Sequence, residues 1–339
     1  MHDGCKVSFL GHGYPTTGGA KNAEMKGLMK QVQSAREFAG DIPLLITEWN
    51  GVCNSRGDWH DETAQPAFLV AAVDAVAAVT PKLEMFAYWA VSDVFTEMGL
   101  PADPVAFHGG FGLISLYGIE KPGFQAFKWL NAAGDLKLAS TVEVATPTSR
   151  PAVAAAATAT ATATAHSASA AATMDTEAVK GSPPHPPPPP PPPTNLTVVP
   201  LLDAESGHLR IFLAANGYVG EQVANRTITL LLKNGALALQ DTGVDAPRSD
   251  SGGGGSSVGT LWRVDETHTN PKALWLSMGK PNYLKPAQVA QLKVAAEPVS
   301  TTVTLTKSSA PHVGWSIQLE LPAFGLAVLD VDVKSTPSA

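Results

Sequence analysis

The first 139 residues alternate between two kinds of hydrophobic pattern. Three short apolar runs are typical of buried parallel strands: Val7–Leu10, Ile42–Asn50 and Leu83–Val91. Between and after them, apolar residues recur at helical spacing, which predicts helices over about 22–38, about 68–79 and from Pro122 onwards. Strand and helix follow each other three times, and this order predicts parallel strands joined by crossover helices.

The last third of the chain has a different pattern. Apolar and polar residues alternate with a period of two in several segments, such as Thr227–Leu232, Ile317–Leu321 and Leu329–Val333. This alternation predicts antiparallel strands in an all-β sandwich domain over residues 196–334. The sequence of Pro286–Ala296 predicts one short helix within this domain.

Residues 140–195 separate the two parts and have low complexity. Alanine and threonine alternate from Ala154 to Ala165, and prolines run unbroken from Pro186 to Pro193. Such a composition cannot bury a core, so we expect a disordered linker with a stiff polyproline II end. The proline run is either a spacer, which composition favours, or a ligand for an SH3- or profilin-like domain. The predicted domains are therefore 1–139, 140–195 and 196–334.

Composition excludes several classes of function. The net charge of -7 and a pI near 5.7 argue against nucleic-acid binding, which needs clustered lysine and arginine. No run reaches the ~18 strongly apolar residues of a membrane helix, so we expect no membrane segment. Cys5 and Cys53 have no zinc-type spacing, and we expect neither a metal nor a cofactor.

Targeting signals are weak. Residues 1–6 show no signal-peptide pattern, and Asn195 and Asn225 each begin an N-glycosylation triplet. These triplets favour a secretory history without establishing it.

Residues suited to sugar chemistry lie at or after the carboxyl end of each predicted strand. His12 and Tyr14 come after the first strand, and Glu48 lies close to the end of the second. Trp89 lies close to the end of the third strand, and Glu97 comes after it. The carboxyl ends of parallel strands meet at one rim of an α/β barrel, where such enzymes keep their chemistry. Structural roles remain open for four of these residues: a turn histidine for His12, a capping or ion-paired carboxylate for Glu48, core packing for Trp89 and a solvated loop charge for Glu97.

Four segments give the chain a resemblance to glycoside hydrolase family 39, which contains β-xylosidases and α-L-iduronidases. They are Pro43–Asn50, Tyr88–Phe95, Phe107–Ile114 and Lys121–Phe127. The region around Arg263–Asp265 and Gly279–Pro298 resembles the accessory β-sandwich of that family more loosely. The resemblance implies a partial TIM barrel made of the last three βα units, followed by the linker and an all-β sandwich.

The resemblance also implies roles for individual residues. Glu48 matches the nucleophile of a retaining glycosidase, and Trp89 matches a platform on which the sugar stacks. His12 and Tyr14 match a pair that holds sugar hydroxyls and the nucleophile. Glu97 matches a substrate-binding glutamate. Thr96 stands where the family usually has a second glutamate, so of the two positions only Glu97 carries over.

One catalytic group of the family is absent from this sequence. The acid/base glutamate belongs to an Asn-Glu-Pro-type motif on an earlier strand, and the chain contains no such motif. We therefore expect no glycosidase activity from this chain alone. A non-catalytic carbohydrate-binding or wall-associated protein is the alternative function. A third hypothesis is that a longer transcript encodes the earlier strands. The resemblance suggests secretion or a lysosomal-type location.

Overall fold

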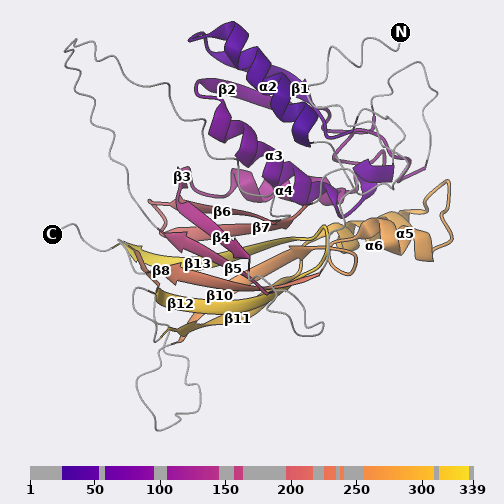
Figure 1. The fold of residues 1–339 in the computed structure, drawn as a ribbon. Helices are drawn as coiled ribbons and strands as arrows, with labels where there is room; N and C mark the ends of the chain where they lie inside the picture. Colours follow the sequence, from indigo (N-terminus) through magenta and orange to yellow (C-terminus); the bar gives the residue numbers. More distant parts are fainter. Residues whose placement is uncertain are drawn as a thin grey trace, which may run out of the picture.

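The computed structural model describes residues 25–52, 58–94, 105–144, 156–162, 196–216, 225–233, 237–239, 256–308 and 313–335. The described chain has a helical part with a small parallel sheet and a second part built on a large curled sheet (Figure 1). The predicted strand at Val7–Leu10, the candidate residues His12, Tyr14 and Glu97, and the proline run Pro186–Pro193 lie outside the described residues.

The helical part contains most of the strands and helices that periodicity predicts. Strand β1 (Leu44–Trp49) pairs in parallel with β2 (Leu83–Tyr88). The helices are α2 (Met25–Ala39), the short 3-10 helix η1 (Asp58–Asp61), α3 (Gln65–Val79) and α4 (Pro122–Asn131). Both α3 and α4 have proline in their first turn, where its missing N–H costs no helical hydrogen bond. The arrangement is that of a partial barrel.

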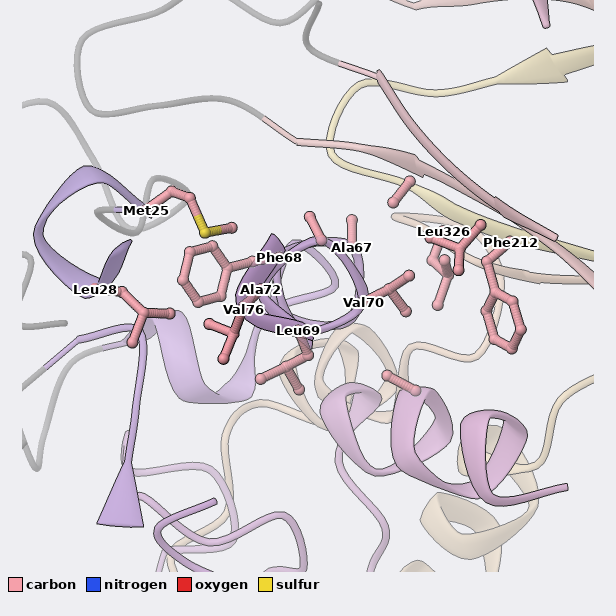
Figure 2. Packing of buried hydrophobic residues seen from close by; sticks show 14 of the residues in the cluster. Met25, Leu28, Ala67, Phe68, Leu69, Val70, Ala72, Val76, Phe212 and Leu326 are labelled. Carbon is pink, nitrogen blue, oxygen red and sulfur yellow. The ribbon is translucent and has the colours of Figure 1, made fainter. Parts of the chain in front are cut away.

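Helix α3 joins the two parts because it is apolar almost all the way round. On one side Phe68 and Val76 approach Met25 and Leu28 of α2; on the other side lies β7 (Figure 2). The β7 residue Phe212, fully buried, belongs to the same cluster as the α3 side chains. A helix that is hydrophobic on every face must be covered on every face. The core of the helical part is therefore continuous with that of the sheet.

The large sheet has eleven strands. Their order along the sheet is β3-β6-β7-β13-β10-β11-β12-β8-β5-β4, and β9 pairs with β13. The strands are β3 (Leu136–Lys137), β4 (Ala139–Val144), β5 (Ala156–Thr162), β6 (Leu196–Asp203), β7 (His208–Ala215), β8 (Arg226–Lys233), β9 (Leu237–Leu239), β10 (Ser256–Val264), β11 (Ser300–Lys307), β12 (Val313–Leu321) and β13 (Leu326–Ser335).

This sheet curls until its two ends meet. Strands β3 and β4 are adjacent in the chain but stand at opposite ends of the pairing order. The Leu138 amide donates to the Pro200 carbonyl at 3.0 Å, and the Ser140 hydroxyl donates to the Val198 carbonyl at 3.0 Å. Apolar side chains from its strands, including Leu230 of β8, fill the space enclosed. The predicted antiparallel alternation is confirmed at β8, β12 and β13, but the strands form one curled path instead of two separate sheets.

Two stretches of the predicted disordered linker are strands. Strand β4 (Ala139–Val144) covers all of residues 140–144, and β5 covers Ala156–Thr162 in and before the alanine–threonine tract. Strand β5 pairs in parallel with β8 and antiparallel with β4. Alternating β-branched threonine with alanine gives the period of two that a pleated strand needs, so the prediction of disorder is wrong for these stretches. The domain boundaries at 139/140 and 195/196 stay predictions.

A helical arm leaves the sheet between β10 and β11. It consists of α5 (Pro271–Ser277), which the sequence did not predict, and α6 (Pro286–Ala296), whose predicted bounds are confirmed. Trp275 of the arm packs against Phe107 with ring centroids 5.6 Å apart, and Lys272 forms an ion pair of 2.7 Å with Glu62. The arm thus supports the loop that follows β2. No helix within the described ranges is long and apolar enough to cross a membrane.

A substitution at Phe212 tests the shared core. Phe212→Ala removes a fully buried ring from the contact with α3, and we expect it to cost about 3–5 kcal/mol. Because the core is continuous, tryptophan fluorescence and far-ultraviolet circular dichroism should report one shared unfolding transition in urea. Val299→Ala, at a 70% exposed position, is the control and should leave the midpoint nearly unchanged. Two separate transitions in the parent protein would contradict a continuous core.

Candidate functional site

Glu48 lies at the carboxyl end of β1, one residue before the strand ends. Its carboxyl group is partly buried, and this desolvation raises the pKa of Glu48 above its usual value. Within the described ranges, no hydrogen bond or ion pair to the Glu48 carboxylate is found. The capping or ion-paired role that the sequence left open therefore has no described partner. A carboxylate in this position is able to meet a ligand at the rim of the barrel.

Aromatic packing fixes the strand pair beneath Glu48. The Trp49 ring stacks on Phe86 of β2 with centroids 4.2 Å apart, and Tyr88 meets it edge-on at 5.5 Å. The Trp89 amide donates to the Trp49 carbonyl at 2.9 Å, so Trp89 sits beside the end of β1. Trp89 is half-buried. The sequence prediction that Glu48 and Trp89 share one rim is consistent with this register.

Asn50 fixes the chain immediately after Glu48. Its buried amide group donates to the Tyr88 hydroxyl at 3.0 Å and to the Trp89 carbonyl at 2.6 Å. Its side-chain oxygen accepts from the Val52 amide at 3.3 Å. The Tyr88 hydroxyl also accepts from Gln65 of α3 at 2.7 Å. These bonds connect the ends of β1 and β2 with the start of α3.

A buried group of charges lies behind the rim. Lys121, fully buried, places its ammonium nitrogen 2.7 Å from Asp61 Oδ1 and 2.6 Å from Asp93 Oδ2, and donates to the Gly110 carbonyl at 3.0 Å. Burial disfavours the charged form of Lys121, but the two carboxylates outweigh it and raise its pKa. Burial likewise raises the pKa of Asp93, against the opposing effect of Lys121. The lysine thus joins η1, the loop after β2 and the glycine segment before α4.

The two carboxylates also hold the glycine-rich segment through its backbone. Asp61 accepts from the Gly109 amide at 2.7 Å, and Asp93 accepts from the Gly112 amide at 2.8 Å. At Gly110 and Gly112 a Cβ atom would collide with Asp93, so no larger residue fits there. This requirement explains the Phe-His-Gly-Gly-Phe-Gly run that the sequence analysis singled out. The His108 Nε2 atom lies 3.8 Å from Asp93 Oδ2.

His60 completes the network and was not predicted. Its Nδ1 atom lies 3.0 Å from the Gly109 carbonyl, and its Nε2 atom lies 3.1 Å from the Val52 carbonyl and 3.2 Å from Asn50 Oδ1. Complete burial, followed by repulsion from Lys121, lowers the pKa of His60 to about 4. His60 is therefore neutral at pH 7 and connects the segment after β1 to the glycine segment.

Of the five predicted site residues, two lie in the described part of the chain. Glu48 and Trp89 stand at the ends of neighbouring strands, while His12, Tyr14 and Glu97 lie outside the described residues. Sequence pattern did not predict the supporting network of Asn50, His60, Asp61, Asp93 and Lys121. These residues come from separate segments of the chain, and only tertiary contact brings them together. The described residues contain no group of histidine, cysteine, aspartate or glutamate able to hold a metal ion.

Comparison with known proteins gives one consistent family. The sequence profile of the glycosyl hydrolases family 39 matches residues 17–185. A β-xylosidase of Caldicellulosiruptor saccharolyticus is 26% identical over 306 residues, covering 87% of this chain and 48% of that protein. A β-xylosidase of Geobacillus stearothermophilus is 39% identical over 94 residues, covering 28% of this chain and 18% of that protein. The chain thus spans less than half the length of these relatives.

Solved structures show the same fold. A family 39 β-xylosidase from Caulobacter crescentus matches with a TM-score of 0.55 and 18% identity, covering 95% of this chain and 50% of that one. A bacterial orthologue of human α-L-iduronidase matches with a TM-score of 0.55 and 13% identity, covering 95% of this chain and 48% of that one. These similarities support a partial barrel followed by a sheet domain.

Removing the buried cation should destabilise the site strongly. Lys121→Met leaves Asp61 and Asp93 buried without their counter-charge, which we expect to cost about 3–5 kcal/mol at pH 7. Urea denaturation followed by tryptophan fluorescence measures the loss. Lys82→Met, which breaks an exposed ion pair with Asp41, is the matched control and should stay close to the parent protein. Equal stability of the two variants would show that the buried network contributes nothing.

His60 should make the protein sensitive to acid. Its folded pKa of about 4 lies below the unfolded value of about 6.5, so the unfolded state binds more protons between these values. Stability from this group is therefore present above pH 6.5 and falls as the pH drops towards 4, by on the order of 3 kcal/mol. His60→Gln should have a flatter stability profile over this window in urea titrations.

His208 provides a control of opposite sign for the His60 experiment. A hydrogen bond to Asp330 raises the pKa of His208, so its contribution is present below pH 6.5 and is lost as the pH rises through the folded value. His208→Gln should therefore leave the acid loss between pH 6.5 and 4 in place. If His60→Gln retains the full acid loss as well, the burial of a neutral His60 is not its cause.

Proposed function

This chain belongs to glycosyl hydrolase family 39, and we propose that it carries the nucleophile half of a retaining glycosidase site, with Glu48 as the nucleophile. The observation that supports this role is the position of Glu48 at the carboxyl end of β1. There its partly buried carboxylate has no partner among the described residues and stands on the rim shared with Trp89. His12, Tyr14 and Glu97 are proposed to bind sugar hydroxyls, by the family resemblance.

The proposed reaction needs a second carboxyl group. A Glu48 oxygen attacks the anomeric carbon while the glycosidic oxygen leaves with a proton from a general acid about 5–5.5 Å away. Water then releases the sugar from Glu48, with the same second group acting as base. Asp61 and Asp93 are poor candidates for that group, because each is tied to Lys121 and to a backbone amide. The family's acid/base motif is absent from this sequence.

The raised pKa of Glu48 has to be offset before Glu48 can act as the nucleophile. A nucleophile must be ionised, whereas burial raises the pKa of Glu48 and so favours its protonated form. Hydrogen bonds to the carboxylate would reverse this effect, since they favour the charged form. We propose that His12 and Tyr14 donate these hydrogen bonds to Glu48. The family resemblance places both residues next to the nucleophile.

We propose a xylose-containing glycoside as the substrate class. Two relatives with similar sequences are β-xylosidases, and the half-buried Trp89 at the end of β2 is an aromatic side chain of the kind on which a pyranose ring stacks. An iduronide is the second candidate substrate, because the structure of an α-L-iduronidase orthologue shares the fold.

The second candidate function is carbohydrate binding without chemistry. It is favoured by the absence of the acid/base motif from a chain that retains Trp89 at the rim. In that case glycan-array binding should survive Glu48→Gln and disappear in Trp89→Ala. Loss of binding in Glu48→Gln would count against it.

The proposal predicts that the purified chain does not turn over unactivated substrates. Phenyl β-xyloside and phenyl α-L-iduronide both have leaving groups that need a proton, and loss of general-acid catalysis costs about 10²–10⁴-fold. We expect no phenol release above the rate in buffer, with folding verified by near-ultraviolet circular dichroism. Turnover that disappears in Glu48→Gln but persists in Glu84→Gln, an exposed glutamate of β2, would show that the site is complete in this chain.

A further inference from the structure

The backbone of Trp89 is held on both sides by the chain that follows Glu48. Its amide donates to the Trp49 carbonyl at 2.9 Å, and its carbonyl accepts from the Asn50 side-chain amide at 2.6 Å. Trp49 and Asn50 are the two residues directly after Glu48. Trp89 and Glu48 are therefore tied together at two points through a very short stretch of chain.

These two hydrogen bonds differ in what they require of the sequence. The bond to the Trp49 carbonyl joins two backbone groups, so most side chains at these positions allow it. The bond to the Trp89 carbonyl needs a side chain that reaches across from the end of β1 and carries a donor. Asn50 meets both requirements, and it is buried. Because a buried amide group is costly to leave without its partner, this bond holds the Asn50 side chain in one position.

The surroundings of Asn50 fix which end of its amide group faces Trp89. The Trp89 carbonyl can only accept a hydrogen bond, so it requires the amide nitrogen. The Val52 amide can only donate, so the Asn50 oxygen lies on that side, at 3.3 Å. The Tyr88 hydroxyl accepts from the same nitrogen as Trp89, at 3.0 Å. The nitrogen thus binds the end of β2, and the oxygen binds the chain after β1.

The chain leaves β1 directly after Trp89. The Ala90 amide donates to the Phe111 carbonyl at 3.2 Å, so the next residue already pairs with the glycine-rich segment. The hydrogen bond from Asn50 lies at this point of divergence. It therefore limits how far Trp89 can move away from β1.

We propose that Asn50 is a positioning residue, which holds the platform Trp89 in a fixed place relative to the nucleophile Glu48. This inference rests on the proposed function. A sugar that stacks on Trp89 presents its anomeric carbon to Glu48 only if the two side chains keep their separation. A misplacement of about 1 Å can cost on the order of 100-fold in rate. Loss of the bond from Asn50 should therefore slow the attack by Glu48, although neither reacting atom is changed.

Asn50→Asp tests the inference by replacing the amide nitrogen with an oxygen, which would face the Trp89 carbonyl without a hydrogen to donate. With 5-fluorotryptophan at all seven tryptophan positions, fluorine NMR should show a shifted or broadened Trp89 resonance, assigned by its loss in Trp89→Phe. Asn216→Asp is the matched control and should leave this resonance in place, because Asn216 is also buried but binds Thr197 of the sheet domain. An unchanged Trp89 resonance in Asn50→Asp overturns the inference.

The second measurement is the rate at which dinitrophenyl β-xyloside labels Glu48, followed by intact-mass spectrometry. Asn50→Asp should lower this rate about 10- to 100-fold, whereas Asn216→Asp should be labelled like the parent protein. In a Trp89→Ala background, which lacks the platform, the same substitution should cost less than about threefold, since Asn50 then has no platform to position.

The outcomes separate this inference from the proposed function. An equal loss of labelling in the parent and Trp89→Ala backgrounds would show that Asn50 does not act through Trp89, and it overturns the inference. A parent chain that is not labelled refutes the nucleophile, and the Trp89 resonance then decides the role of Asn50. If Asn50→Asp does not fold, as judged by near-ultraviolet circular dichroism, Asn50→Ala takes both measurements, because it removes the amide group without adding a charge.

Discussion

The arrangement of the rim depends on one buried cation. Lys121 has no access to water, and its charge is compatible with that position only because Asp61 and Asp93 lie 2.7 and 2.6 Å away. The two carboxylates use their other oxygens to hold Gly109 and Gly112. Charges buried in a low dielectric must be paired and hydrogen-bonded, and this requirement fixes the relative positions of three segments. One segment follows β1, one follows β2 and one precedes α4. The same requirement therefore fixes the chain next to the ends of β1 and β2, where the candidate site lies.

Helix α3 connects the segments around the site to the rest of the molecule. It contributes Gln65 to the hydrogen bonds around Tyr88 and, one turn later, Phe68 and Leu69 to the shared core. On its other side it packs against Phe212 of the curled sheet. The helical arm forms a second connection, through Lys272 and Trp275. The sheet domain therefore supports the rim from two directions, although it contributes none of the proposed catalytic residues.

Local pattern was sufficient for much of this fold and for part of the site. The apolar run ending in Glu48, the helical spacing around Phe68 and the alternation along β12 each reflect a single element burying one face, which periodicity reveals. At strand β5 two features of the sequence conflict: the low-complexity composition predicts disorder, whereas the period of two predicts the strand that forms. Lys121, Asp61 and His60 were missed because their roles arise from contacts between residues far apart in the chain. No local feature distinguishes such a lysine from a solvated one.

The central claim is that Glu48 is the attacking carboxylate of a site whose proton donor lies elsewhere. Dinitrophenyl β-xyloside tests it directly, because its leaving group departs without a proton and the first step then needs only the nucleophile. Intact-mass and peptide mass spectrometry after incubation with this compound should find one xylosyl group attached to Glu48, and none in Glu48→Gln. An unmodified protein, or a sugar attached at another residue, would contradict the account.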